Sequence, residues 1–283
     1  FKGLFTQGMV CHETYKDKNG NWISPDEVIS LEGKKVLEND TRHEVKVGPS
    51  ESMSKSKKNT IDPEKIINNY GADAVRLFIL SDSPPERDIQ WSDEGISASN
   101  KFIHKLWNLN LKILENIKLK NNEDPDNILE KNTNIFLNEV SNNLINFRYN
   151  KIVANFHQIY NEVFKLIDRN YSKETLVQNY KKILIAMNPV IPHFSNECLK
   201  LLDEKLDLIK WPKINEELIE EQNINYVIQI NGKKRGIIQT EKGISEKNLI
   251  ILVERSDDLK KYFVNKPIKK KIFIPNKLLN IIL

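Results

Sequence analysis

Apolar residues recur at helical spacing from residue 93 to about residue 221, and this pattern constrains the fold more strongly than any other part of the sequence. Polar, Asn-rich connectors such as residues 121–127 divide the pattern into separate helices. Prolines within residues 188–193 mark the end of one helix and the start of the last. The repeat is clearest near its beginning, at Phe102, Ile103, Leu106, Leu109, Ile113 and Leu114. The sequence therefore predicts an α-helical bundle over residues 92–222.

The first fifty residues alternate short β-type runs with turn signals. Asn19 and Gly20 stand between two such runs, near Tyr15 and Trp22, and the Asn-Gly pair favours a type I′ hairpin. This part of the chain is expected to be a small β region.

Two helices are predicted after a basic loop at residues 50–59. The first should begin at Pro63, because Asp62 is a suitable N-cap and proline fits the first helical position, and it should end at Gly71. Residues 73–80 form the second, better-buried helix.

A linker with two prolines, residues 81–87, comes before a short extended segment at residues 88–91. Ser92 can then cap the first helix of the bundle. The first domain boundary is therefore placed between residues 91 and 92.

Residues 225–283 change character again and predict a small β-β-α-α-β-β unit. Two strands flank a tight turn that begins at Asn231, Ser245 and Asp257 each start a short helix, and a second strand pair surrounds Pro275. Taken together, the segments predict an α+β chain that is mostly α.

Positive charge is concentrated in the same C-terminal segment. Residues 225–283 hold thirteen Lys or Arg against five Asp or Glu, a net charge of +8, whereas the residues before them have a net charge of −4. Such an asymmetry indicates a partner with negative charge, for which nucleic acid is the leading candidate.

Composition excludes several classes of protein. A chain of 283 residues with 39% hydrophobic residues can bury the cores of about two domains, which excludes a disordered or collagenous protein. No apolar run reaches the roughly 20 residues that cross a bilayer, and the start lacks the pattern of a signal peptide, so we expect a cytoplasmic protein. Only Cys11 and Cys198 are present, without metal-ligand spacing, and no metal site is predicted.

The basic loop has the chemistry of a polyphosphate site. Three Lys and two Ser stand within the seven residues 53–59, shortly before a helix whose electropositive N-terminus attracts anions. Lysine places a point charge on a flexible stem, and serine adds short hydroxyl contacts. A solvated basic loop without a ligand is the alternative interpretation.

The residues around this loop resemble a known family. Met-Ser-Lys-Ser-Lys from Met53, then Asn-x-Ile-Asp-Pro, then Tyr-Gly-Ala-Asp-x-x-Arg, is similar to the second signature of class I aminoacyl-tRNA synthetases. Gly-Met-Val from Gly8 and the segment 81–91 resemble the leucyl-tRNA synthetase family rather than its isoleucine, valine or methionine relatives. The Pro-x-x-Pro-His and Trp-Pro segments resemble the helical anticodon-binding domain that these four families share, and the tail resembles the C-terminal domain of the leucyl family, so the resemblance covers essentially the whole chain.

The resemblance implies three parts. Residues 1–91 would be the end of a Rossmann-type catalytic domain with the ATP loop and a region that contacts the tRNA stem. Residues 92–222 would be the helical anticodon-binding domain, and residues 225–283 a basic tRNA-binding domain.

Roles for the loop residues follow from the same resemblance. Lys55 is expected to contact the phosphates of ATP, with Mg²⁺ accompanying the nucleotide, while the carboxylate of leucine displaces pyrophosphate. Met53, Ser54 and Ser56 are expected to shape the loop. Where the family usually has the first lysine of the loop, this chain has Ser52, and Lys57 or Lys58 could take over its contact.

Other parts of the family's active site are not found in the sequence. The first signature with its two histidines, the leucine pocket and the inserted editing domain have no match, and the five histidines do not recreate them. His193 is interpreted as structural. Because the chain begins inside an apolar run, we expect a part of the protein to precede it. We expect the protein to be a monomer, and we expect this chain alone not to activate leucine.

Two basic clusters are the predicted contacts with the phosphate backbone of leucine tRNA. They are Lys233, Lys234 and Arg235 at a hairpin turn, and Lys269, Lys270 and Lys271 before the last strands. Trp91 and Trp107 could stack on bases, but Trp107 at helical spacing is better explained as part of the core.

Two alternatives stay open at this stage. The chain could be a non-catalytic tRNA-binding protein derived from a synthetase, although such a protein has no need for the loop at Met53. It could also be an isoleucyl, valyl or methionyl relative, which the segment 81–91 and the tail disfavour.

Overall fold

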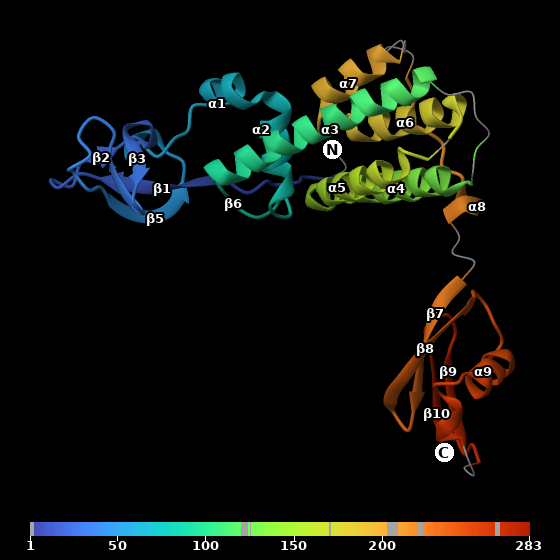
Figure 1. The fold of residues 1–283 in the computed structure, drawn as a ribbon. Helices are drawn as coiled ribbons and strands as arrows, with labels where there is room; N and C mark the ends of the chain where they lie inside the picture. The colour runs from blue at the N-terminus through green and yellow to red at the C-terminus, as the bar shows by residue number, and fades with distance from the viewer. Residues whose placement is uncertain are drawn as a thin grey trace. The chain divides into compact units, whose positions relative to one another are not determined.

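The structure is a computed structural model that describes residues 3–119, 124, 126–169, 171–202, 209–219, 223–263 and 267–283. The chain divides into two units, Phe1–Asn215 and Glu216–Leu283, and each is described here by itself (Figure 1). Within the described residues, the helices hold more of the chain than the strands do, and the fold is a mixed α and β fold.

Strand β1 is the shared partner in the first sheet (Figure 1). β2 and β5 pair with it antiparallel, and β6 pairs with it in parallel. The parallel pairing places the extended segment predicted at residues 88–91 beside the start of β1. The strands are β1 (Val10–Lys16), β2 (Trp22–Ile23), β5 (Lys46–Ser52) and β6 (Ile89–Gln90).

The predicted hairpin between Tyr15 and Trp22 is present, but its predicted type I′ turn is wrong. A type I′ turn needs a positive φ at both central residues. Gly20 has a φ of +84°, whereas Asn19 is not among the residues with positive φ. The carboxylate of Asp17 explains the wider turn, because it accepts hydrogen bonds from the backbone N–H groups of Asn19 and Asn21, both at 2.8 Å.

A second small sheet completes the predicted β region. β3 (Val28–Leu31) and β4 (Lys34–Leu37) pair antiparallel after the 3-10 helix η1 (Pro25–Glu27). Val28 and Leu37 lie opposite each other in this pair and pack on the buried side chains of Tyr15, Ile23 and Val45. The two sheets therefore share one core.

The basic loop is shorter than predicted. Residues 50–52 belong to β5, because they continue its pairing with β1 as far as Cys11 opposite Ser52. The 3-10 helix η2 (Lys55–Lys57) lies in the remaining loop. Helices α1 (Pro63–Tyr70) and α2 (Ala72–Ser81) follow as predicted, with Asp62 accepting from the backbone nitrogen of Glu64 and Gly71 between them at a φ of +83°.

The helical bundle predicted from the apolar periodicity is confirmed. Its core includes Phe102, Leu106, Leu109 and Ile113, all nearly inaccessible to solvent. Ser92 starts the first helix, because its hydroxyl accepts a hydrogen bond from the backbone nitrogen of Gly95 at 3.1 Å. The helices are α3 (Asp93–Leu119), α4 (Ile128–Ile145), α5 (Tyr149–Leu166), α6 (Lys173–Met187) and α7 (Pro192–Leu201).

The second unit contains one sheet in the order β8-β7-β10-β9, with α9 packed on one face. β7 and β10 are parallel, and the other two pairings are antiparallel. Ser245 caps α9 as predicted, but the helix predicted from Asp257 is only a 3-10 turn, η4. The elements are a short α8 (Glu216–Ile219), β7 (Asn223–Ile230), β8 (Lys233–Glu241), α9 (Glu246–Arg255), η4 (Lys260–Tyr262), β9 (Lys270–Ile274) and β10 (Leu278–Ile282).

No helix within the described residues has the length and apolarity that crossing a membrane would require. In the same part of the chain, no three His, Cys, Asp or Glu side chains gather as potential metal ligands. Cys11 and Cys198 are both buried and both free thiols.

Candidate phosphate-binding loop

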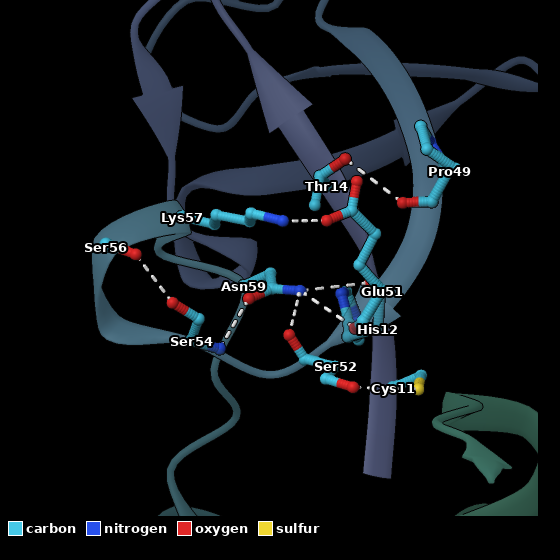
Figure 2. A network of polar contacts seen from close by, with 10 residues as sticks. All are labelled: Cys11, His12, Thr14, Pro49, Glu51, Ser52, Ser54, Ser56, Lys57 and Asn59. Carbon is cyan, nitrogen blue, oxygen red and sulfur yellow. Dashed lines mark hydrogen bonds and ion pairs between the residues drawn. The ribbon is translucent and has the colours of Figure 1, made fainter. Parts of the chain in front are cut away.

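Asn59 fastens the basic loop to the first sheet (Figure 2). Its side chain is completely buried, with 0% exposure. The amide oxygen accepts a hydrogen bond from the backbone nitrogen of Ser54 at 2.8 Å, and the amide nitrogen donates to the carbonyls of Glu51 at 3.1 Å and His12 at 3.3 Å. Both ends of the loop are thereby tied to β1 and β5.

Asn59 carries no signal in the sequence that marks it as a functional position. A short polar side chain directly after a run of lysines carries no signal of burial. Its role depends on the strand carbonyls of His12 and Glu51, which only the fold brings beside it.

Three residues predicted to shape the loop lie in this turn. The backbone nitrogen of Met53 donates to the carbonyl of Val10 at 3.1 Å, which prolongs the pairing of β5 with β1. The hydroxyl groups of Ser54 and Ser56 lie 2.7 Å apart and share a hydrogen bond (Figure 2). The serines therefore stabilise the compact shape of the turn.

Lys58 closes the turn in a left-handed conformation, with φ of 54° and ψ of 19°. Its backbone nitrogen donates to the carbonyl of Lys55 at 3.2 Å. For a residue with a Cβ atom this conformation costs roughly 1–2 kcal/mol, and glycine avoids that cost. The reversal lets the next residue, Asn59, enter the core.

The three lysines of the loop have different surroundings. The ammonium group of Lys57 contacts the carboxylate of Glu51 on β5, and both side chains are about one-third exposed, at 38% and 35% (Figure 2). Lys55 and Lys58 are exposed, and within the described residues their ammonium groups form no ion pair. Ser52 ends β5 with its hydroxyl 4.0 Å from the sulfur of Cys11.

Asp73 connects α2 to the beginning of α7. Its buried carboxylate accepts hydrogen bonds from the backbone nitrogens of Phe194 at 2.6 Å and His193 at 3.3 Å. The ring nitrogen Nδ1 of His193 also lies 3.0 Å from this carboxylate. His193 thus has a structural contact, in line with its interpretation from the sequence.

Arg76, one turn further along α2, binds the same corner of the bundle. Its guanidinium donates to the carbonyl of Val190 at 2.9 Å and to that of Pro189 at 2.8 Å. The Asp and Arg of the Tyr-Gly-Ala-Asp-x-x-Arg segment therefore attach the helices that follow the loop to the α6–α7 connection.

The two tryptophans considered for base stacking take part in packing. Trp91 lies edge-on to Phe78, at 5.3 Å between ring centroids, and its indole nitrogen donates to Asp93 at 3.0 Å. Trp107 packs against the core of the bundle and lies edge-on to Phe194.

The predicted tRNA-binding clusters of the second unit lie on opposite edge strands of its sheet. Lys233 and Lys234 are on β8, and Lys270 and Lys271 are on β9, with two strands between them. Register places Lys234 in one row with Gln229, Asn280 and Ile272, on the face away from α9. Three inter-strand spacings, from β8 through β7 and β10 to β9, separate the two edge strands by roughly 14 Å, so the clusters can contact different phosphates.

Arg235 is the extra residue of a β-bulge, since Lys234 pairs with Gln229 while Gly236 pairs with Ile228. The bulge directs its guanidinium over the ring of Tyr262, 5.0 Å from the centroid. Lys269 precedes β9 and is exposed. The first cluster therefore offers two lysines and one arginine that is stacked on an aromatic ring.

Comparison with known proteins places these features in a family context. The anticodon-binding domain of tRNA ligase matches residues 126–250, and tRNA synthetases class I (I, L, M and V) match residues 45–92, which include the loop. Leucine–tRNA ligase of Orientia tsutsugamushi is 42% identical over 100% of this chain, and that of Bartonella henselae is 37% identical over 100%. The chain resembles leucine–tRNA ligase along its whole length. It spans about a third of these ligases, 34% of each.

A solved structure agrees at the level of the fold. The LeuRS of Agrobacterium radiobacter, in a ternary complex with tRNA and LeuAMS, superposes with a TM-score of 0.69 at 22% sequence identity. The match covers 82% of this chain and 30% of that LeuRS. The resemblance to leucine–tRNA ligases inferred from the signature residues is thus confirmed, and the isoleucyl, valyl and methionyl alternatives are not favoured.

Proposed function

We propose that this chain is the C-terminal part of a leucine–tRNA ligase, which contributes ATP phosphate binding for leucyl-adenylate formation and binding of leucine tRNA. The observation that carries the proposal is the ordered basic loop, tied down by Asn59 and matched by the class I synthetase family. A protein that only bound tRNA would have no use for an anchored cationic turn of this kind.

Lys55 is the proposed phosphate ligand in the activation step. The reaction joins the carboxylate of leucine to the α-phosphate of ATP and releases pyrophosphate, so it depends on positioning and charge neutralisation rather than on a covalent nucleophile. Lys55 has an exposed ammonium group on a turn whose shape is maintained by Met53, Ser54 and Ser56. We propose that Mg²⁺ enters with ATP and is held by its phosphates.

The basic clusters of the second unit are the proposed tRNA contacts. Lys233, Lys234 and Lys269–Lys271 are exposed, and a separation of roughly 14 Å between the edge strands allows each cluster to neutralise its own phosphates. Arg235 can add a planar guanidinium that is already oriented by Tyr262. These contacts position the RNA and carry no base information.

The finer division of the chain is part of the proposal. Residues 1–91 would end a Rossmann-type catalytic domain, 92–222 would form the anticodon-binding domain, and 225–283 the basic tRNA-binding domain. We propose a cytoplasmic enzyme that acts as a monomer, with leucine, ATP and leucine tRNA as substrates of the complete ligase.

Activation of leucine tests the role of the loop. In the complete ligase, Lys55→Ala should lower the rate of leucine-dependent ATP–pyrophosphate exchange by about 10²- to 10³-fold, the effect of losing one preorganised charged donor. The 283-residue chain alone should show no exchange. A normal exchange rate in the Lys55→Ala ligase would refute the assignment.

Binding of tRNA tests the second unit. The chain is titrated with leucine, isoleucine and valine tRNAs over a series of salt concentrations. We expect preference for leucine tRNA with a steep dependence on salt, lost when residues 225–283 are deleted. Equal and weak binding of all three tRNAs would contradict the proposed tRNA contacts.

A further inference from the structure

We infer that Lys58 is a second phosphate-binding residue of the loop and supplies the positive charge that the family's first loop lysine would supply at Ser52. The inference rests on the proposed function, because it concerns the same ATP site. It separates two lysines, Lys57 and Lys58, that the sequence alone left equivalent.

The start of the loop lacks a positive charge. Ser52 ends β5 opposite Cys11, and its hydroxyl group lies 4.0 Å from the sulfur of Cys11. The position therefore contributes no cation. Lys55, Lys57 and Lys58 are the basic residues that remain in the turn.

Lys57 is poorly placed to replace this charge. Its ammonium group contacts the carboxylate of Glu51, which projects from the strand beneath the turn (Figure 2). A phosphate bound at Lys57 would lie next to this carboxylate and be repelled by it, since like charges a few ångströms apart disfavour each other. Lys57 is thus better suited to bracing the turn against β5.

Lys58 closes the same turn that Lys55 begins. A hydrogen bond of 3.2 Å from its backbone nitrogen to the carbonyl of Lys55 joins the ends of one 3-10 turn. The side chains of Lys55 and Lys58 are exposed, and neither ammonium group has an ion-pair partner among the described residues. Two flexible stems that leave one turn can reach oxygens of the same triphosphate.

The backbone of Lys58 supports a role for its side chain. At φ of 54° and ψ of 19°, glycine would be the residue of least strain, yet the chain has lysine there. Residues in sparsely populated backbone conformations cluster at functional sites, which makes the side chain of Lys58 a candidate for a functional role. If the turn alone were needed, glycine would serve it better than lysine does.

This conflict between side chain and backbone gives a direct test. In the complete ligase, Lys58→Gly keeps the left-handed turn and removes the ammonium group. Lys55→Ala tests the proposed function in parallel. Lys18→Gln, on the β1–β2 turn, is the control. The readouts are KM for ATP and kcat in ATP–pyrophosphate exchange, together with the melting temperature of each variant.

We expect Lys58→Gly to raise KM for ATP roughly tenfold, the effect of about one charged contact, while its melting temperature stays equal or rises. Lys57→Gln should change KM less than twofold, and Lys18→Gln should behave as the parent. A Lys58→Gly ligase with unchanged KM, beside a defective Lys55→Ala ligase, overturns this inference alone. Unchanged kinetics in both variants overturn the proposed ATP site itself.

Discussion

The carboxylate of Asp73 lies 2.6 Å from the backbone nitrogen of Phe194, although 121 residues separate them in the sequence. Asp73 belongs to the helix pair that follows the basic loop, and Phe194 to the first turn of α7. A residue from one segment therefore caps a helix of another, so the loop and the bundle are joined within one structural unit.

Removing this cap should destabilise the first unit. Asp73→Ala leaves the first N–H groups of α7 without their acceptor, and we expect the free energy of unfolding to fall by about 2 kcal/mol. Urea unfolding followed by circular dichroism measures the change. Asp82→Ala, which removes an exposed carboxylate at the end of the same helix, should have almost no effect. Equal stability of the two variants would contradict the capping role.

Asn59→Ala should loosen the loop and lower stability. The substitution deprives the Ser54 N–H and the Glu51 carbonyl of their partner, at a cost of about 1–3 kcal/mol. Hydrogen exchange is the sharper measurement, because the Ser54 amide should lose its protection. Asn116→Ala, at a half-buried position on α3 whose side chain bonds to its own helix, provides the control. Unchanged protection of Ser54 would show that another contact orders the loop.

Gly8→Ala should disturb the contact between residue 8 and the linker at residues 81–87. A Cβ atom at Gly8 would lie 2.0 Å from the carbonyl oxygen of Arg87, which is backbone and cannot rotate away. The hydrogen bond from Gly8 to Pro85 would then be displaced. We expect a loss of about 1–3 kcal/mol, the usual cost of overpacking, in thermal unfolding. Gly3→Ala, where no atom lies within 4 Å, should be neutral.

Alkaline pH should destabilise the bundle through Cys198. Burial raises the pKa of this thiol from 9.0 to about 12. The contribution of the thiol is complete below pH 9, where it is protonated in both states. Above pH 9 the unfolded chain loses the proton first, so the free energy of unfolding falls as pH rises towards 12, by at most about 1.4 kcal/mol per pH unit.

The variant Cys198→Ala should show a shallower decline over this range in urea unfolding. Burial also raises the pKa of Tyr180, which acts in the same direction and remains in the variant. Cys11→Ala serves as the control for removing a buried thiol. An identical pH dependence of Cys198→Ala and the parent would refute the assignment.

Single lysines on the sheet edges should change the salt dependence of tRNA binding. Lys234→Gln or Lys270→Gln should each reduce the slope of log K against log salt concentration by about one if each binds one phosphate. The double variant should reduce it by about two, because the residues lie on separate edge strands. Lys18→Gln, in the first unit, is the matched control. A slope unaffected by both edge substitutions would exclude them as phosphate contacts.

Local signals in the sequence were sufficient for most elements. Asp62 with Pro63, Ser92 and Ser245 each mark a helix start because capping depends on a few adjacent residues. The tight turn at Asn231 and Gly232 was predicted for the same reason, and both residues have positive φ, at 51° and 76°. The type I′ turn predicted from Asn19 and Gly20 does not form, because the carboxylate of Asp17 accepts hydrogen bonds from the backbone N–H groups of the turn.

Contacts between distant segments could not be read from the sequence. Asn59 becomes important only beside the carbonyls of His12 and Glu51, and Asp73 only beside α7. The distinction between Lys57 and Lys58 likewise depends on a strand that ends before the loop begins. The signature residues were therefore enough to locate the candidate site. Which lysine has an ion-pair partner could be learned only from the fold.

The parallel pairing of β7 with β10 has a consequence for the order of folding. Val227 pairs with Leu278, so the strand that completes the centre of the second sheet comes after α9 and β9 in the chain. Helical bundles rely on contacts close in sequence and fold quickly, whereas pairings between distant strands form slowly. Until β10 pairs, the β7–β8 hairpin has an unpaired edge along β7, and an unpaired strand edge can pair with another chain.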